Sequence, residues 1–153
     1  IELKNPRLWS PDSPYLYTIL HEILDEQKSQ LDVHLHSHGF RYFSVDPAKG
    51  FFLNGKPLKL IGTCRHQDLF ENANALEDFR HIQDIKLIKD MGMNFIRMSH
   101  YPHDQALLDA CDKYGIIVWK EIPIVDLIDT TKAFEQNAIN QLQEMIAQYS
   151  NHS

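Results

Sequence analysis

An alternation of short apolar segments with helix-like segments in the second half of the chain constrains the fold most. Apolar segments at 58–62, 94–98 and 116–119 are each followed by a polar stretch and then by residues at helical spacing. Short connections of this kind predict parallel strands joined by right-handed crossovers. The second half is therefore predicted to be α/β, either a (β/α)8 barrel or a doubly wound sheet.

Three helices are predicted after these strands. The first is expected to end at Gly92 and carries an apolar residue at every third position: Leu76, Phe79, Ile82, Ile85, Ile88 and Met91. The second is expected to begin at an Asp104 N-cap and to end at Gly115. The third is predicted over residues 132–149, with a buried face formed by Phe134, Ala138, Leu142, Met145, Ile146 and Tyr149.

The first part of the chain has a different pattern. Aromatic, β-branched and alternating residues predict strands at 15–23, 31–35 and 40–45. Turn residues at 46–50 lead into a predicted hairpin around Asn54-Gly55, a pair that tolerates the positive φ of tight hairpin turns. We predict a β domain over residues 1–46 and an α/β domain over residues 47–153.

Polar residues follow all three predicted strands of the second half. The clusters are Thr63–Asp68, Arg97–His103 and Lys120–Pro123. A single Arg or His after a strand is more often a loop residue that binds backbone carbonyls. Three clusters at the carboxyl edge of one parallel sheet, however, favour a ligand site. Glu121 is expected to be partly buried, with Arg97 or a ligand hydroxyl as its partner.

Composition and missing motifs exclude several classes of protein. The net charge is −6 and the 15 Lys and Arg residues are dispersed, which argues against a nucleic-acid partner. No apolar run approaches the ~20 residues of a membrane span. The sequence contains no Gly-rich phosphate loop, Gly-x-Ser-x-Gly elbow or Cys-x-x-Cys pair.

Two further features are weighed against simpler explanations. His34, His36 and His38 alternate and would project from one strand face, where imidazoles can bind zinc or copper. Because no acidic or thiol ligand accompanies them, we favour an exposed polar strand face. Of the two cysteines, Cys111 falls on a predicted helix and is expected to be a buried free thiol, and Cys64 follows the first strand.

A series of motifs, in this order, resembles glycoside hydrolase family 2, the β-galactosidase and β-glucuronidase group. The motifs are Trp9-Ser-Pro-Asp-Ser-Pro-Tyr-Leu-Tyr17, Gly39-Phe-Arg41, Phe52-Leu-Asn-Gly-Lys-Pro57, Arg65-His66-Gln67-Asp68, Ile96-Arg97-Met-Ser-His100-Tyr-Pro102 and Cys111-Asp-Lys-Tyr-Gly115. The resemblance covers essentially the whole chain. It implies the last strands of an immunoglobulin-like sandwich up to about residue 46, followed by the first three βα units of a (β/α)8 TIM barrel.

The resemblance also implies roles for individual residues. His66, Asp68, Arg97, His100 and Glu121 would bind the nonreducing sugar of a substrate with a terminal β-linked sugar, with no metal and no cofactor. Retaining glycosidases need two carboxyl groups ~5 Å apart. The family supplies them as glutamates on later strands, so we expect no catalytic residue within this chain and predict that residues 1–153 alone are inactive.

The sequence favours one substrate class among those of the family. The Arg65–Asp68 loop has no obvious uronate pocket, which favours a β-galactosidase over a β-glucuronidase or β-mannosidase. The alternative is a noncatalytic carbohydrate-binding module. Three barrel strands would leave open edges, which we expect to be covered by further copies of the chain or by more of a longer protein. A secreted or periplasmic setting is common for such enzymes.

Overall fold

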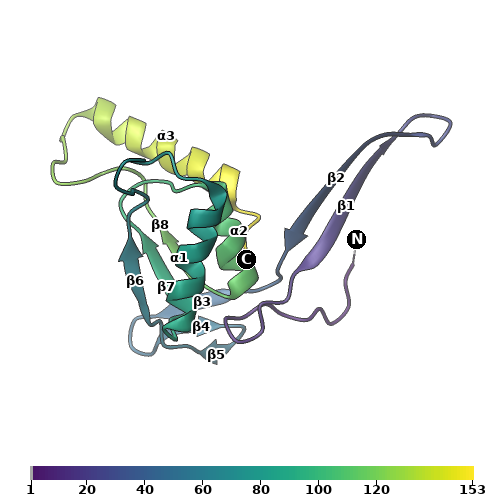
Figure 1. Ribbon diagram of the computed structural model, residues 1–153, viewed down its shortest axis with the longest axis horizontal. Helices are drawn as coiled ribbons and strands as arrows, with labels where there is room; N and C mark the ends of the chain where they lie inside the picture. The colour runs from purple at the N-terminus through teal and green to yellow at the C-terminus, as the bar shows by residue number, and fades with distance from the viewer. Residues whose placement is uncertain (1) are drawn as a thin grey trace.

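The computed structural model describes residues 2–153, which form a two-stranded ribbon, a small antiparallel sheet and an α/β unit (Figure 1). The elements in chain order are β1 (Tyr17–Leu24), β2 (Gln30–His38), β3 (Phe43–Asp46), β4 (Gly50–Leu53), β5 (Lys56–Pro57), β6 (Gly62–Arg65), α1 (Asp78–Asp90), β7 (Phe95–Met98), α2 (Gln105–Tyr114), β8 (Ile117–Lys120) and α3 (Lys132–Tyr149).

The α/β unit is built on a parallel sheet in the order β6-β7-β8. Helices α1 and α2 cover one face of this sheet (Figure 1). Because side chains alternate along a strand, Ile96 and Met98 of β7 point to the helices and are fully buried. They pack with Ile85, Leu107 and Cys111 in the main core. The parallel pairing is the arrangement that the strand–helix alternation predicts.

The predicted helix ends are confirmed. The Asp104 side chain accepts a hydrogen bond from the Ala106 backbone N–H at 2.8 Å, which makes it the N-cap of α2. Gly115 ends α2 in the left-handed conformation, with φ of 74°. Gly92 follows α1 with φ of 79°, and its N–H donates to the Lys89 carbonyl. Cys111 is buried and free, as expected.

The predicted strand at 58–62 is wrong in position, because β6 runs over Gly62–Arg65. The Asn94 side chain explains the difference. Its Oδ1 accepts from the Ile61 N–H at 2.8 Å and its Nδ2 donates to the Lys59 carbonyl at 3.0 Å. These bonds take the place of a strand ladder before β6. The ladder begins at Gly62, where a Cβ atom would lie 2.0 Å from the Phe95 carbonyl oxygen.

The apolar stripe predicted for α1 is buried only in its middle. Ile85 and Ile88 are buried, whereas Phe79 is 52% exposed and Met91 is 69% exposed. A step of three residues falls about 60° short of a full turn, so a long stripe with this spacing drifts off the buried face. His81 is buried instead of the stripe's outer members.

The buried face predicted for α3 is also partly wrong. No residue of α3 is buried, and the predicted core residues Leu142 and Ile146 are 43% and 57% exposed. Helix α3 lies across the end of the parallel sheet rather than on its face (Figure 1). It therefore makes a shallow contact through one line of half-buried residues, namely Phe134, Ala138, Gln141, Met145 and Tyr149.

The small sheet β3-β4-β5 lies at the opposite end of the parallel sheet from α3 (Figure 1). Asn54 and Gly55 have φ of 51° and 77°, so the predicted tight hairpin turn is confirmed between β4 and β5. Leu53 of β4 packs with Trp9 and Ile117 in a second core. This core joins the N-terminal segment to the start of the parallel strands.

Strands β1 and β2 form an antiparallel ribbon that extends away from the α/β unit (Figure 1). His34, His36 and His38 share one face of β2, as their alternation predicts. The His21 ring of β1 stacks on His36 with centroids 5.0 Å apart. Within residues 2–153 no group of three or more His, Cys, Asp or Glu side chains is arranged to hold a metal ion. None of the described helices is long and apolar enough to cross a membrane.

Candidate functional site

The face of the parallel sheet that points away from α1 and α2 carries a row of polar side chains near the strand ends. Cys64, Arg97 and Trp119 are in register on β6, β7 and β8, so their side chains project from the same face. Glu121 lies two residues beyond Trp119 and reaches back to this row. The site is therefore assembled from three strands by parallel pairing and by the two-residue period of strands.

Arg97 and Glu121 form a two-pronged ion pair at the centre of the row. Arg97 Nε donates to Glu121 Oε1 at 2.6 Å, and Arg97 Nη2 donates to Glu121 Oε2 at 3.0 Å. The Arg97 bond lowers the pKa of Glu121 and, in return, the pKa of Arg97 is raised. The arginine side chain is 40% exposed and the glutamate side chain 20% exposed. The pair is therefore charged and accessible from outside the sheet.

His100 lies against this ion pair. Its Nδ1 is 3.1 Å from Arg97 Nη2 and 3.3 Å from Glu121 Oε2. Its Nε2 has no hydrogen-bond partner among the described residues, and the side chain is 31% exposed. Trp119 Nε1 donates to Glu121 Oε1 at 3.0 Å. We refer to Arg97, His100, Trp119 and Glu121 as the Arg97 cluster.

The loop after β6 meets the loop after β7 beside this cluster. The His66 ring lies edge-on to His100, with centroids 5.2 Å apart. Tyr101 Oη accepts from the Gln67 backbone N–H at 3.3 Å and lies 3.5 Å from His66 Nδ1. Asp68 is exposed and takes part in no hydrogen bond or ion pair within residues 2–153. Of the five predicted site residues, the structure gathers all but Asp68 through direct contacts.

Three members of this neighbourhood were not predicted as site residues: Cys64, Tyr101 and Trp119. The two-residue strand period places Cys64 and Trp119 on the same face as Arg97 once the strand registers are known. The register between two strands that are distant in the sequence cannot be predicted from either strand alone. Arg65, by contrast, belongs to the predicted cluster after the first strand but points to the helix side and is 8% exposed.

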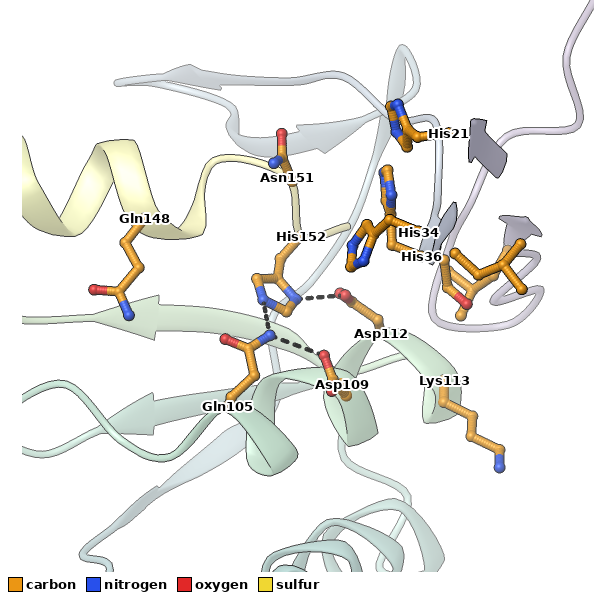
Figure 2. A pocket seen from close by; sticks show the side chains of 13 residues that line it. His21, His34, His36, Gln105, Asp109, Asp112, Lys113, Gln148, Asn151 and His152 are labelled. Carbon is orange, nitrogen blue, oxygen red and sulfur yellow. Dashed lines mark hydrogen bonds and ion pairs between the residues drawn. The ribbon is translucent and has the colours of Figure 1, made fainter. Parts of the chain in front are cut away.

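A hollow of about 790 Å³ lies elsewhere (Figure 2). It is bordered by the ribbon histidines His21, His34 and His36 on one side and by α2 and the last residues of the chain on the other. On its floor His152 Nδ1 lies 2.6 Å from Asp112 Oδ2 (Figure 2). None of the five predicted site residues borders this hollow.

The chemistry of the Arg97 cluster suits hydrogen bonding to hydroxyl groups. Glu121 offers carboxylate oxygens whose position is fixed by three side chains, and His100 offers a free ring nitrogen. Glu121 is a poor proton donor, because its hydrogen bonds stabilise the ionised form. The arrangement can therefore bind and orient a polyhydroxyl ligand.

Comparisons with known proteins agree along the whole chain. The family model described as the TIM barrel domain of family 2 glycosyl hydrolases matches residues 45–153. A second model of family 2 glycosyl hydrolases matches residues 1–41. A β-glucuronidase of Bacteroides fragilis is 41% identical over 98% of this chain, and a β-galactosidase of Bacteroides ovatus is 41% identical over 79% of it.

Solved structures give the same result. Bacteroides uniformis β-glucuronidase 2, covalently bound to cyclophellitol-6-carboxylate aziridine, is 48% identical, with a TM-score of 0.88 over 96% of this chain and 18% of its own. The apo structure of Bacteroides uniformis β-glucuronidase 3 is 39% identical, also with a TM-score of 0.88, over 98% of this chain and 19% of its own. This chain spans 23% of the Bacteroides fragilis relative and 14% of the Bacteroides ovatus relative. The chain therefore belongs to glycosyl hydrolase family 2.

Proposed function

We propose that residues 1–153 are part of a retaining exo-β-glycosidase that hydrolyses O-glycosidic bonds to a terminal β-linked sugar. The observation that carries the proposal is the Arg97 cluster at the carboxyl ends of three parallel strands, where barrel enzymes place their ligand sites. Membership of a family of glycosyl hydrolases supports it. In this proposal residues 1–46 end an immunoglobulin-like sandwich, and residues 47–153 form the first three βα units of a TIM barrel.

His66, Asp68, Arg97, His100 and Glu121 are proposed to line the subsite for the nonreducing sugar. The His100 ring nitrogen and the Glu121 carboxylate would hydrogen-bond sugar hydroxyls, and such bonds strengthen in an oxocarbenium-like transition state. Arg97 would also help to keep a neighbouring nucleophilic carboxylate ionised through its positive charge. Asp68 is exposed on the same loop as His66, and we propose that a bound sugar links it to the others.

The two catalytic carboxyl groups are proposed to come from outside this chain. A retaining enzyme needs one protonated carboxyl group and one carboxylate ~5 Å apart. Glu121, the acidic member of the Arg97 cluster, is held ionised and therefore cannot donate a proton. Both of its oxygens are already engaged by donors from Arg97 and Trp119 and by the His100 ring, which makes it a poor nucleophile. Purified residues 1–153 are accordingly expected to release no nitrophenol from any aryl β-glycoside.

A β-galactoside is our first proposed substrate. A uronate substrate brings a carboxylate that requires a cation with free N–H groups, and Arg97 already spends two of its donors on Glu121. Arg65 faces the helices, where Asp84 neutralises it. A β-glucuronide is the second candidate, which the 48% identity to Bacteroides uniformis β-glucuronidase 2 favours. A binding cation would then have to come from parts of the enzyme outside residues 1–153.

The test is an assay of the full-length protein on nitrophenyl β-galactoside, β-glucuronide and β-mannoside, beside its His100→Ala variant. We expect cleavage of one substrate and a fall in turnover for the variant. Gln83→Ala, a change on the exposed face of α1, serves as the control and should leave turnover unchanged. Sugar binding without cleavage of any substrate would contradict the enzyme proposal and indicate a noncatalytic carbohydrate-binding module.

A further inference from the structure

A second arginine cluster lies behind the sheet, on the side of the helices. Arg65 at the end of β6 contacts His81 and Asp84 of α1 and His103 of the loop after β7. Arg65, His81 and His103 are 8%, 1% and 2% exposed, respectively. We refer to these four residues as the Arg65 cluster. A buried arginine of this kind is costly unless several partners satisfy it.

The hydrogen bonds of the cluster determine where its protons lie. Arg65 Nε donates to Asp84 Oδ2 at 2.8 Å, Nη2 lies 3.3 Å from His81 Nδ1, and Nη1 lies 3.5 Å from His103 Nδ1. Because a guanidinium only donates, both Nδ1 atoms must accept. Each imidazole therefore carries its proton on Nε2 and is neutral. Burial lowers the pKa of His81, and it lowers the pKa of His103 to about 4, in agreement with this assignment.

The neutral His103 ring completes a cycle of hydrogen bonds that starts and ends at Arg65. His103 Nε2 donates to the Ser99 carbonyl at 3.2 Å. The Ser99 backbone N–H in turn donates to the Arg65 carbonyl at 3.0 Å. Arg65 thus holds both ends of the segment Ser99–His103, one end through its backbone and the other through its side chain. The residues between these two anchors are His100, Tyr101 and Pro102.

This segment contains two residues of the candidate site, His100 and Tyr101. His100 lies against the Arg97–Glu121 pair, and Tyr101 contacts both Gln67 and His66. The Tyr101 ring also packs against His103, with centroids 5.0 Å apart. A displacement of the anchored ends would therefore move the His100 ring relative to Glu121. In enzyme sites a shift of about 1 Å can cost about 100-fold in rate.

We propose that Arg65 is a positioning residue for sugar binding, which acts through His103 and the Ser99–His103 segment to fix His100 and Tyr101 at the subsite. The inference rests on the proposed function. It adds a positioning role for a residue on the opposite face of the sheet. Arg65 itself touches no sugar in this arrangement. Its planar fork is needed because three separate partners must be bound at once, which a lysine ammonium at one point cannot do.

The test compares Arg65→Lys with Arg80→Lys in the full-length enzyme. Arg80 lies on the same helix as His81 but is exposed and donates to Gln83. Arg80→Lys is therefore the same chemical change at a position outside the Arg65 cluster. We expect Arg65→Lys to raise KM and to lower kcat/KM by about tenfold or more. Arg80→Lys should stay within about twofold of the wild type. Thermal unfolding of each variant measures any loss of folded protein separately.

A double-mutant cycle distinguishes positioning from a general structural role. If Arg65 acts through His100, the Arg65→Lys effect should shrink to less than about threefold when His100 is already alanine. A purely structural role would give the same factor in both backgrounds and would overturn the inference. If Arg65→Lys fails to fold, His103→Asn takes its place. The amide oxygen can still accept from Arg65, but the shorter side chain cannot also place its NH2 where His103 Nε2 donates to the Ser99 carbonyl. The same shrinkage is expected.

The outcomes separate the two proposals. An inactive wild-type enzyme would overturn the proposed function and this inference with it. An active wild type whose kcat/KM is unchanged by Arg65→Lys would overturn the inference alone and leave the proposed function standing.

Discussion

The Arg65 and Arg97 clusters lie on opposite faces of the same parallel sheet and use the same residue types. Each has an arginine that donates to a carboxylate and contacts at least one histidine. The Arg65 side chain is 7% exposed, whereas the Arg97 side chain is 40% exposed. The histidines differ as well, because His103 has partners for both ring nitrogens and His100 keeps one free. The two clusters therefore differ in burial and in the number of unused hydrogen-bonding groups, and not in residue composition. These two properties make the Arg97 cluster, and not the Arg65 cluster, suited to bind a ligand.

Removal of the exposed arginine should have the largest effect, and it should fall on activity. Arg97→Ala leaves Glu121 without its two-pronged partner, so we expect kcat/KM of the full-length enzyme to fall by about 100-fold or more. The free energy of unfolding should change little, because the pair is partly exposed. Steady-state kinetics and urea unfolding measure the two quantities. Activity within threefold of the wild type would place Arg97 outside the site.

Acid should weaken the buried cluster. His103 has a folded-state pKa of about 4 against about 6.5 when unfolded, so between these values the unfolded chain binds the proton that the folded chain excludes. Stability is complete above about pH 6.5 and falls as the pH drops toward 4, by at most about 3 kcal/mol. The lowered pKa of His81 acts in the same direction. Urea unfolding across this range, with His103→Asn as a non-titrating control, should show a flatter pH dependence for the variant.

Removing the carboxylate charge of each pair should affect stability unequally. Asp84→Asn leaves the buried Arg65 charge uncompensated, and we expect a loss of about 2 kcal/mol. This is less than for a fully buried pair, because the Asp84 side chain is 43% exposed. Glu121→Gln should cost under about 1 kcal/mol, since water reaches the Arg97 guanidinium. Equal losses in urea unfolding would contradict the distinction between the two clusters.

The smallest effect on activity is expected at Trp119. Trp119→Phe keeps an aromatic ring but removes the N–H that donates to Glu121 Oε1. One such hydrogen bond contributes about 1 kcal/mol, which corresponds to about a fivefold loss in kcat/KM. Kinetics of the full-length enzyme measure it. A larger loss with an unchanged melting temperature would mean that the indole N–H itself contacts the sugar.

The correct predictions share a local cause. The Asp104 cap, the glycines at the helix ends and the Asn54-Gly55 turn each depend on a few neighbouring residues, so the pattern of the segment suffices. The drift of the α1 stripe also follows from local helical geometry, but the other two errors have a distant cause. Asn94 is 33 residues from Ile61, yet its side chain displaces the start of β6. The exposure of Leu142 and Ile146 depends on how α3 packs at the end of the sheet. The spacing of apolar residues along the helix does not predict that position.

The candidate site divides in the same way. The sequence by itself determined that polar residues follow three parallel strands, because strand and helix periodicities are local properties of the chain. Only the tertiary structure decided that Arg97 faces outward and Arg65 faces the helices, that Trp119 donates to Glu121, and that His103 lies between Arg65 and the Ser99 carbonyl. The physical reason is that pairing registers and burial arise from contacts between distant segments, and these contacts determine which charges water can reach.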